Sequence, residues 1–255
     1  MVHIFYMNLS GDCSYEQSLA LYKFLPEERK RKVKSAKQED VARNRLYTGA
    51  FLQYVLSEET GIPMENISYV YGEQGKPEID YRKLEELPIY DTYNIEEKIY
   101  TRRYFNLSHS GEYVVLAVSD RPVGIDIEYK KRNFDSVAKR CFCKSEYNDN
   151  LKAAALEDRE QRFLQYWTMK EAFIKHSGEG LSVPLNSFQI VRGDTGISYV
   201  EDGQVWFFSC FWGEKPYCIS LCSESEQDVR RILEKNRETD FGLKQVTIGN
   251  ICHGI

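Results

Sequence analysis

The sequence lacks several features that would each have pointed to a particular class of protein. Its formal net charge is -5 over 255 residues, so no general positive field is available for nucleic acid. No window approaches the run of about 20 apolar residues that a membrane span needs, and residues 1–6 do not form a signal peptide. We therefore expect a cytosolic globular protein with any anion-binding site confined to a local patch.

Cysteine is present, but not in a metal-binding arrangement. The seven cysteines are an odd number, and the close pairs Cys141/Cys143 and Cys218/Cys222 match no zinc-ribbon spacing and have no nearby histidine. Reduced and mostly buried thiols are expected. The middle of the chain also contains no Gly/Ser linker, which predicts that its parts pack closely across a shared cleft.

Strand-like and helix-like segments alternate along the whole chain. A basic segment (27–37) runs into a stretch with apolar residues at helical spacing (39–61), which predicts one or two helices. Two β-branched runs (113–118 and 124–128) separated by a short turn have the pattern of a hairpin. The predicted strands are 3–7, 67–71, 113–118, 124–128, 188–191, 205–211 and 217–222, and the predicted helices are 14–25, 27–61, 135–140, 144–156, 159–177 and 224–237. Residues 78–103 have no steady period and are expected to form a long surface loop.

Two carboxylates occur in the segment Gly-Ile-Asp-Ile-Glu. On a strand, Asp126 and Glu128 point the same way, while Ile125 and Ile127 face the opposite side. Two adjacent carboxylates are favourable where a cation lies between them, and a hard cation such as Mg²⁺ takes oxygen ligands. A strand with one solvated acidic face is the alternative.

A second acid lies on the strongest predicted helix, in Trp-Thr-Met-Lys-Glu-Ala-Phe-Ile-Lys. Glu171 and Lys175 are one turn apart at the margin of the apolar face formed by Phe163, Tyr166, Trp167, Phe173 and Ile174. Glu171 could complete a site of three carboxylates, and Lys175 could pair with phosphate oxygens. An ordinary helical ion pair explains the same spacing.

The segment Phe-Asn-Leu-Ser-His-Ser-Gly ends a predicted strand with small polar residues. A hydroxyl at Ser108, an imidazole at His109 and free backbone N–H groups suit an anionic oxygen. A nucleophilic Ser-His pair is disfavoured, because adjacent residues of an extended segment point apart. A turn that satisfies its own backbone is the remaining alternative for Ser110 and Gly111.

Positive charge is concentrated near the start of the chain. The run 29–32, with Lys34, Lys37 and Arg43, could attract a multiply charged phosphate or an acidic protein surface. Such a run is also common on a solvated helix face. Lys76 and Pro77 form a Gly-Lys-Pro turn that is uninformative by itself.

Along the chain the motifs occur in a fixed order: the basic run, Gly-Lys-Pro, Phe-Asn-Leu-Ser-His-Ser-Gly, Gly-Ile-Asp-Ile-Glu and Trp-Thr-Met-Lys-Glu-Ala-Phe-Ile-Lys with a following Gly-Glu-Gly-Leu. This ordered set resembles the 4'-phosphopantetheinyl transferases of the surfactin-synthetase-activating type, from about residue 20 to about residue 190. The resemblance implies an α+β fold of two similar halves related by a pseudo-twofold axis, with halves at residues 1–119 and 120–255 in one monomeric chain. It implies transfer of the 4'-phosphopantetheine group of coenzyme A to a serine of an apo acyl or peptidyl carrier protein. Adenosine 3',5'-bisphosphate is then released.

The resemblance also assigns residues to roles. It places Mg²⁺, or Mn²⁺, on Asp126, Glu128 and Glu171. On chemical grounds Glu171, directly or through a metal-bound water, is the candidate base for the carrier serine. It assigns coenzyme A to the residues Lys175, Ser108, His109, Lys76, Pro77, Arg31 and Arg43. Two features depart from the family pattern: Glu28 stands where a lysine is expected, and the stretch from Pro77 to Phe105 is longer.

Three alternatives from other classes compete with the transferase. The first is a catalytically silent coenzyme A or carrier-protein binding module of the same fold, which loss of a metal carboxylate would favour. The second is a serine hydrolase using Ser108 and His109, for which no nucleophile elbow is present. The third, a nucleic-acid binder using residues 29–37, is opposed by the net charge.

Overall fold

The computed structural model describes residues 1–10, 19–85, 101–129, 134–152, 155–193, 196–212, 216–238 and 243–253. Its first half contains β1 (Val2–Asn8), η1 (Tyr22–Phe24), α2 (Glu27–Lys34), α3 (Glu39–Thr60), η2 (Met64–Asn66), β2 (Tyr69–Tyr71), β3 (Pro77–Ile79), α4 (Tyr81–Glu85), β4 (Tyr104–Ser110) and β5 (Tyr113–Ser119). Its second half contains β6 (Val123–Glu128), α5 (Phe134–Cys141), the π-helical η4 (Glu146–Lys152), α6 (Leu156–Ser177), η5 (Gly180–Ser182), β7 (Val191–Gly193), β8 (Gly196–Glu201), β9 (Gln204–Trp212), β10 (Cys218–Ser223) and α7 (Glu226–Glu238). Last come β11 (Lys244–Gln245) and α8 (Ile248–His253).

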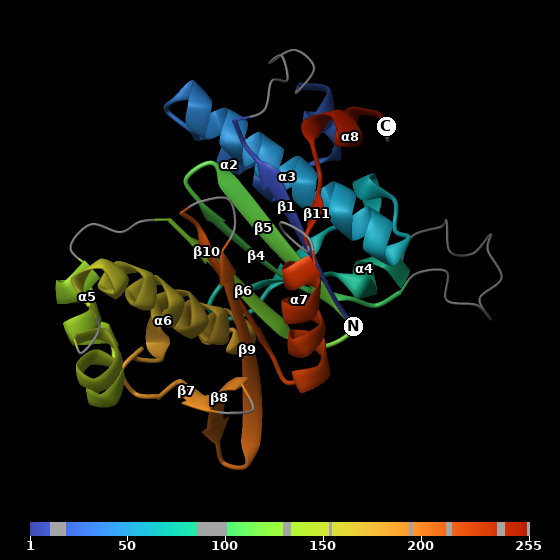
Figure 1. Ribbon diagram of the computed structural model, residues 1–255. Helices are drawn as coiled ribbons and strands as arrows, with labels where there is room; N and C mark the ends of the chain where they lie inside the picture. Colours follow the sequence, from blue (N-terminus) through green and yellow to red (C-terminus); the bar gives the residue numbers. More distant parts are fainter. Residues whose placement is uncertain are drawn as a thin grey trace.

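Two main sheets form the centre of the molecule, and each half contributes one long helix (Figure 1). The first sheet has the strand order β11-β1-β5-β4, and the second has the order β6-β10-β9-β8-β7. β2 and β3 form a separate two-stranded sheet. The fold is therefore α+β, as the sequence predicts.

The order of elements is repeated between the halves. In each, a strand (β1 or β6) precedes a 22-residue helix (α3 or α6), and two later strands complete an antiparallel set in which β1 pairs with β5 and β6 pairs with β10. Both helices end at a left-handed glycine, Gly61 at φ 79° and Gly178 at φ 78°, a conformation that glycine adopts without steric cost. The repetition makes the two helices equivalent elements.

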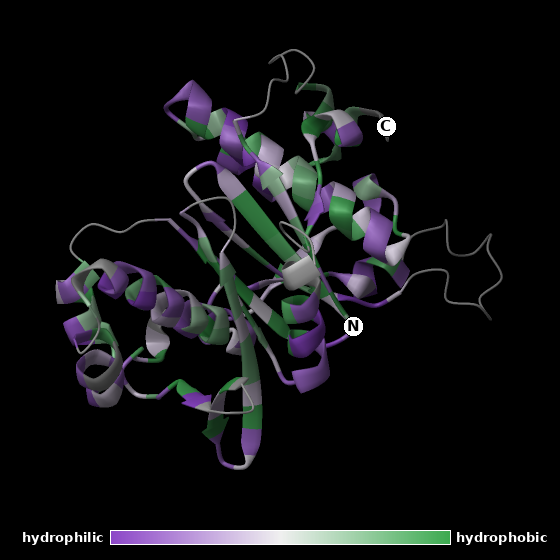
Figure 2. Ribbon diagram, viewed as in Figure 1, coloured by the Kyte–Doolittle hydropathy of each residue, from purple (hydrophilic) through white to green (hydrophobic). Residues whose placement is uncertain are grey.

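Apolar side chains form three clusters. In Figure 2 much of the ribbon of the central strands has the hydrophobic colour. Alternate residues of each strand enter different clusters, as the period of two requires. On β1, Phe5 and Met7 pack under α3, whereas Ile4 and Tyr6 join a core shared with the second sheet and α7. This shared core holds the two sheets together.

The strands that flank the turn at 119–122 do not form the predicted hairpin. β5 pairs with β1 and β4, while β6 pairs with β10 almost 100 residues later. A short turn between two β-branched runs can join two strands of one hairpin or two strands of different sheets. Which strands pair depends on side-chain packing with segments far away in the sequence. The chain thus leaves the first sheet and enters the second at this turn.

Polar side chains of β4 join the two sheets where no main-chain ladder does. Ile125 N donates to Asn106 Oδ1 at 2.9 Å, Ile127 N to Ser108 Oγ at 3.4 Å and Tyr129 N to Ser110 Oγ at 3.1 Å. The spacing of two residues on both strands keeps β4 and β6 side by side. Three of the polar residues in the Phe-Asn-Leu-Ser-His-Ser motif therefore have a structural role.

Some of the other predicted helices, strands and loops agree with the structure and others do not. The segment 27–61 forms two helices, and helix 159–177 is found as α6, which begins three residues earlier. The predicted loop 78–103 contains β3 and α4, its residues 86–100 lie outside the described residues, and so does part of helix 14–25. β8, β11 and α8 were not predicted, and no helix in the described parts is long and apolar enough to cross a membrane.

Candidate active site

The site is built where α6 lies directly on β6. Gly124 makes this contact possible, because a Cβ at that position would lie 1.9 Å from the Ala172 carbonyl oxygen and 2.6 Å from the His176 backbone nitrogen. Ile125 and Ile127 enter the shared core, so Asp126 faces the α6 side, as the alternation predicts.

Asp126 is buried and bonded to a lysine from the helix. Lys175 Nζ lies 2.6 Å from Asp126 Oδ1 and donates to Ser108 Oγ at 2.8 Å, and Ser108 Oγ donates to the same carboxylate at 2.8 Å. Burial raises the pKa of Asp126, while Lys175 and Ser108 oppose that shift by stabilising the charged form. The structure therefore brings Asp126, Lys175 and Ser108 together at one point from β6, α6 and β4.

The other two carboxylates are on the same two elements, Glu128 on β6 and Glu171 on α6. Glu128 is on the same side of β6, accepts from Ser110 Oγ at 2.8 Å, and its charge acts on Asp126. Glu171 precedes Lys175 by one helical turn. Among the described residues, however, no three His, Cys, Asp or Glu side chains lie close enough together to hold a metal ion.

The donor set nevertheless suits a hard cation. Asp126 and Glu128 share one side of a strand, Glu171 lies on the helix packed over it, and all three offer carboxylate oxygens. Lys175 now supplies the positive charge that the buried Asp126 requires. A cation could take that position if the lysine turned toward an anion.

A basic cavity lies on the opposite face of β4. His109 points away from Ser108, into a cavity of about 510 Å³ that Arg29, Lys32, Asn44 and Arg45 also line. Arg29 Nε is buried and has no hydrogen-bond partner among the described atoms. A buried guanidinium nitrogen without an acceptor favours an anionic ligand.

Arg31 and Arg43, which the resemblance assigns to coenzyme A, lie outside this cavity. Both are exposed, whereas Arg29, Lys32 and Arg45 line the cavity. Residues 29 and 32 share a helix face and residue 31 does not, so the helical period contained the signal. The face that meets His109 follows from how α2 packs on α3.

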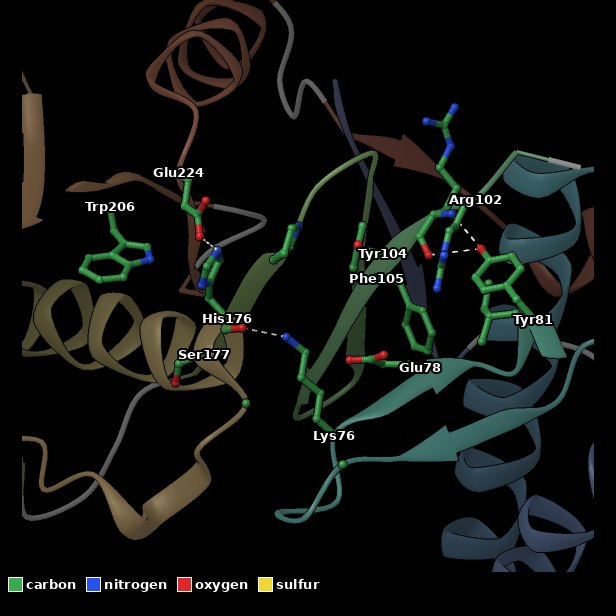
Figure 3. Close-up of a pocket in the computed structure, with 15 residues that line it drawn as sticks. Lys76, Glu78, Tyr81, Arg102, Tyr104, Phe105, His176, Ser177, Trp206 and Glu224 are labelled. Atoms are coloured by element: carbon green, nitrogen blue, oxygen red, sulfur yellow. Dashed lines mark hydrogen bonds and ion pairs between the residues drawn. The ribbon is translucent and has the colours of Figure 1, made fainter. Parts of the chain in front are cut away.

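Lys76 belongs to a second cavity, of about 440 Å³, between the two halves (Figure 3). Its Nζ donates to the His176 carbonyl oxygen at 2.8 Å, at the carboxyl end of α6, where a cation complements the helix dipole. Burial lowers the pKa of Lys76. Pro77 begins β3 opposite Tyr71 and does not line this cavity.

The buried imidazole of His176 should make the free energy of unfolding depend on pH. Burial, and secondarily the Lys76 charge, lowers its pKa to about 4, so the folded protein holds it neutral between pH 4 and its ordinary value of 6.5. The unfolded chain binds the extra proton in that window, so stability is lost as pH falls. Between pH 7.5 and 5.0 we expect His176 to account for about 2 kcal/mol of lost unfolding free energy.

Urea unfolding of the wild type and of His176→Gln at both pH values measures this contribution. The variant should lose less stability on acidification than the wild type. An equal loss in the two proteins would contradict the assignment to His176.

Together, the fold and site define a class: a two-half α+β protein whose junction carries a carboxylate–lysine centre beside a basic cavity. Comparison with known families gives that class its name. The model of the 4'-phosphopantetheinyl transferase superfamily matches residues 122–226, and that of the 4'-phosphopantetheinyl transferase N-terminal family matches residues 12–121. The chain belongs to the 4'-phosphopantetheinyl transferase superfamily.

Several curated proteins are similar to it. The 4'-phosphopantetheinyl transferase Sfp of Bacillus subtilis (strain 168) is 32% identical over 213 residues, which cover 82% of this chain and 87% of that protein. A 4'-phosphopantetheinyl transferase of Bacillus subtilis is 40% identical over 123 residues, 47% of this chain and 54% of the relative. The psf-1 transferase of Bacillus pumilus is 39% identical over 155 residues, 61% of this chain and 58% of its own length.

Proposed function

We propose that this protein transfers the 4'-phosphopantetheine group of coenzyme A to a serine of an acyl or peptidyl carrier protein. The observation that carries the proposal is the pairing of Asp126 with Lys175 at the junction of the halves, with the basic cavity at His109 on the other face of β4. The relatives' names as transferases of this group support it.

We further propose that Mg²⁺, or Mn²⁺, is held by Asp126, Glu128 and Glu171. When bound, the ion would stabilise the negative charge that develops on the diphosphate during displacement at phosphorus. Lys175 leaves Asp126 in this proposal and pairs with a phosphate oxygen, so that one positive charge replaces another beside the buried carboxylate. Ser108 keeps its hydroxyl at the same point.

The chain's own residues would orient both substrates. The carrier serine oxygen forms the new bond to phosphorus, the bond to the bridging oxygen breaks, and adenosine 3',5'-bisphosphate leaves. Glu171 is the candidate base for the serine proton. Arg29, Lys32, Arg45 and His109 would receive the 3'-phosphate in their cavity, and the turn at Lys76 and Pro77 would contact the nucleotide.

The wider setting is also a proposal. Residues 1–119 and 120–255 would act as the two halves of a cytoplasmic monomer, with residues 243–253 returning to the first half. The retention of Asp126, Glu128 and Glu171 argues against a catalytically silent binding module.

The experiment that tests the function is direct. The protein is incubated with apo carrier proteins, coenzyme A and Mg²⁺, and each carrier is weighed by mass spectrometry. A gain of one phosphopantetheine mass is expected, and chelation with EDTA should abolish it until Mg²⁺ or Mn²⁺ is restored. Absence of the gain with every carrier tested would refute the transfer reaction, and transfer in full EDTA would refute the metal.

The basic cavity provides a matched pair of variants. Arg29→Ala should raise KM for coenzyme A by about tenfold, because a charge-assisted hydrogen bond to phosphate contributes about 1.5–3 kcal/mol. Arg31→Ala, on the same helix but outside the cavity, should leave KM within twofold. Steady-state kinetics with coenzyme A and with dephospho-coenzyme A separates the two variants.

With dephospho-coenzyme A, which has no 3'-phosphate, the difference between Arg29→Ala and the wild type should vanish. A penalty that persists with that substrate would place the 3'-phosphate elsewhere. A larger effect of Arg31→Ala would restore the exposed face of α2 as the phosphate site.

A further inference from the structure

A second charged pair lies inside the catalytic half, next to the proposed site in sequence but facing the other way. Lys170 and Glu146 are both 0% exposed, and Lys170 Nζ lies 2.9 Å from Glu146 Oε2. The ammonium also lies 4.2 Å from the centre of the Phe188 ring. Removing two charges from water costs several kcal/mol for each ion, which the attraction between the two charges and further hydrogen bonds must offset.

The pair satisfies backbone groups of a segment without regular structure. Lys170 Nζ donates to the carbonyl oxygens of Leu185 at 2.8 Å and Phe188 at 2.6 Å, and Glu146 Oε1 accepts from Ile190 N at 2.8 Å. Glu146 Oε2 accepts from Cys143 N at 3.0 Å. One ion pair therefore ties α6 to the chain before it and to the chain after it.

In the first half, an uncharged side chain binds the segment that follows the equivalent helix. Gln53 is the fifteenth residue of α3, and Lys170 is the fifteenth residue of the equivalent α6. Gln53 is also buried, and its amide donates to the carbonyl oxygens of Met64 at 2.8 Å and Ile67 at 3.1 Å in the segment after the helix. A neutral amide is thus sufficient to hold a loop to a helix at this position.

The two helices differ in what they carry. α6 presents Glu171 and Lys175 to the site, and Lys175 Nζ must reach Asp126 at 2.6 Å. Successive helical residues are about 100° apart, so the rotation of α6 that buries Lys170 also fixes where Glu171 points. Thr168, bonded to Ser220 of β10 at 2.8 Å, holds the other side of the helix.

We propose that the Lys170–Glu146 pair is a positioning device that sets the rotation of α6 and so aims Glu171 and Lys175 at the site. Lys170 and Glu146 are positioning residues, because neither contacts the Asp126 cluster in the described contacts. A charged pair constrains geometry more than an apolar replacement does, since it requires specific partners. The proposal rests on the proposed transfer reaction where kcat is the measurement. It does not rest on that reaction where hydrogen exchange is the measurement.

Two variants and a control separate an effect on the orientation of α6 from an effect on the stability of the protein. Lys170→Met leaves Glu146 buried without its cation and should lower the unfolding midpoint by about 10 °C. Lys170→Met/Glu146→Leu removes both charges and should recover most of that midpoint. Its kcat should remain at least tenfold below wild type, with KM for coenzyme A within twofold, because the phosphate cavity is not touched.

Gln53→Met is the matched control on the equivalent helix. It should destabilise the protein, while the folded enzyme keeps a kcat within twofold of wild type. Hydrogen exchange gives a readout that is independent of activity: amides of residues 171–177 should exchange faster in the double variant and at the wild-type rate in Gln53→Met. A wild type that transfers nothing refutes the proposed function, and the exchange measurement still decides this inference.

Two results would overturn the proposal. The first is a double variant that regains kcat together with its midpoint, which would make the pair purely stabilising. The second is unchanged exchange over residues 171–177 in the double variant.

Discussion

Replacing Asp126 by Asn should reduce phosphopantetheine transfer by about 1000-fold or more while leaving the protein folded. The carboxylate is the point at which β6, α6 and Ser108 converge, and it is the proposed metal ligand with the greatest burial. Loss of a charge-stabilising group worth several kcal/mol in the transition state gives a rate loss of this size. The carrier mass-spectrometry assay measures it.

Stability should change little in the same variant. Burial raises the pKa of Asp126, which means that the folded protein carries a cost for the charged form, and Asn removes that cost. Lys175 loses its partner, but its side chain is 27% exposed and can be solvated. Unfolding midpoints of the variant and the wild type should therefore agree within a few degrees.

Asp120→Asn is the matched control. Asp120 is a carboxylate on the turn that leads into β6, half exposed and bonded to the amino terminus rather than to the site. It should keep wild-type turnover. Wild-type turnover in Asp126→Asn itself would show that the chemistry takes place elsewhere.

Replacing Gly124 by Ala should strongly destabilise the folded protein, although it adds only one methyl group at the junction of α6 and β6. The new Cβ would overlap backbone atoms of α6 at Ala172 and His176, and neither can move as a side chain would. The helix must shift off the strand, at a cost of about 3 kcal/mol or more. For a protein of this size that lowers the unfolding midpoint by about 10 °C.

Transfer should fall in the folded fraction as well, because a displaced α6 moves Glu171 and Lys175 away from Asp126 on β6. Gly249→Ala is the control: its Cβ would meet nothing nearer than Thr247 Oγ1 at 3.5 Å, and alanine is favoured over glycine in a helix, so calorimetry should show no loss of unfolding midpoint. Equal midpoints for the two alanine variants would contradict the contact at Gly124.

Local periodicity predicted the parts of the site that depend on one element. The alternation on β6 places Asp126 opposite Ile125 and Ile127, and the αL glycine at Gly178 ends α6 where expected. These features follow from backbone geometry within a few residues, which the sequence records directly. The ordered motifs predicted the family, which the comparisons confirm.

What the sequence did not predict depends on partners far along the chain. The strand at 123–128 pairs with a strand almost 100 residues later, a choice that no local turn signal contains. Lys170 is the clearest example: a lysine among apolar residues is ordinarily expected at the surface, and its partner Glu146 lies 24 residues earlier, at the start of the π-helical η4. The gathering of the three carboxylates around a metal stays a prediction.

The return of the last described residues to the first half has a consequence for how the protein is made. Val246, Ile248 and Ile251 belong to the same apolar cluster as Phe51 and Leu116, and β11 lies beside β1. A ribosome releases these residues only after the elements of the second half have been synthesised. The amino-terminal half must therefore keep an uncovered apolar surface until residues 246–251 have left the ribosome, and exposed apolar surface of this kind promotes aggregation of the nascent chain.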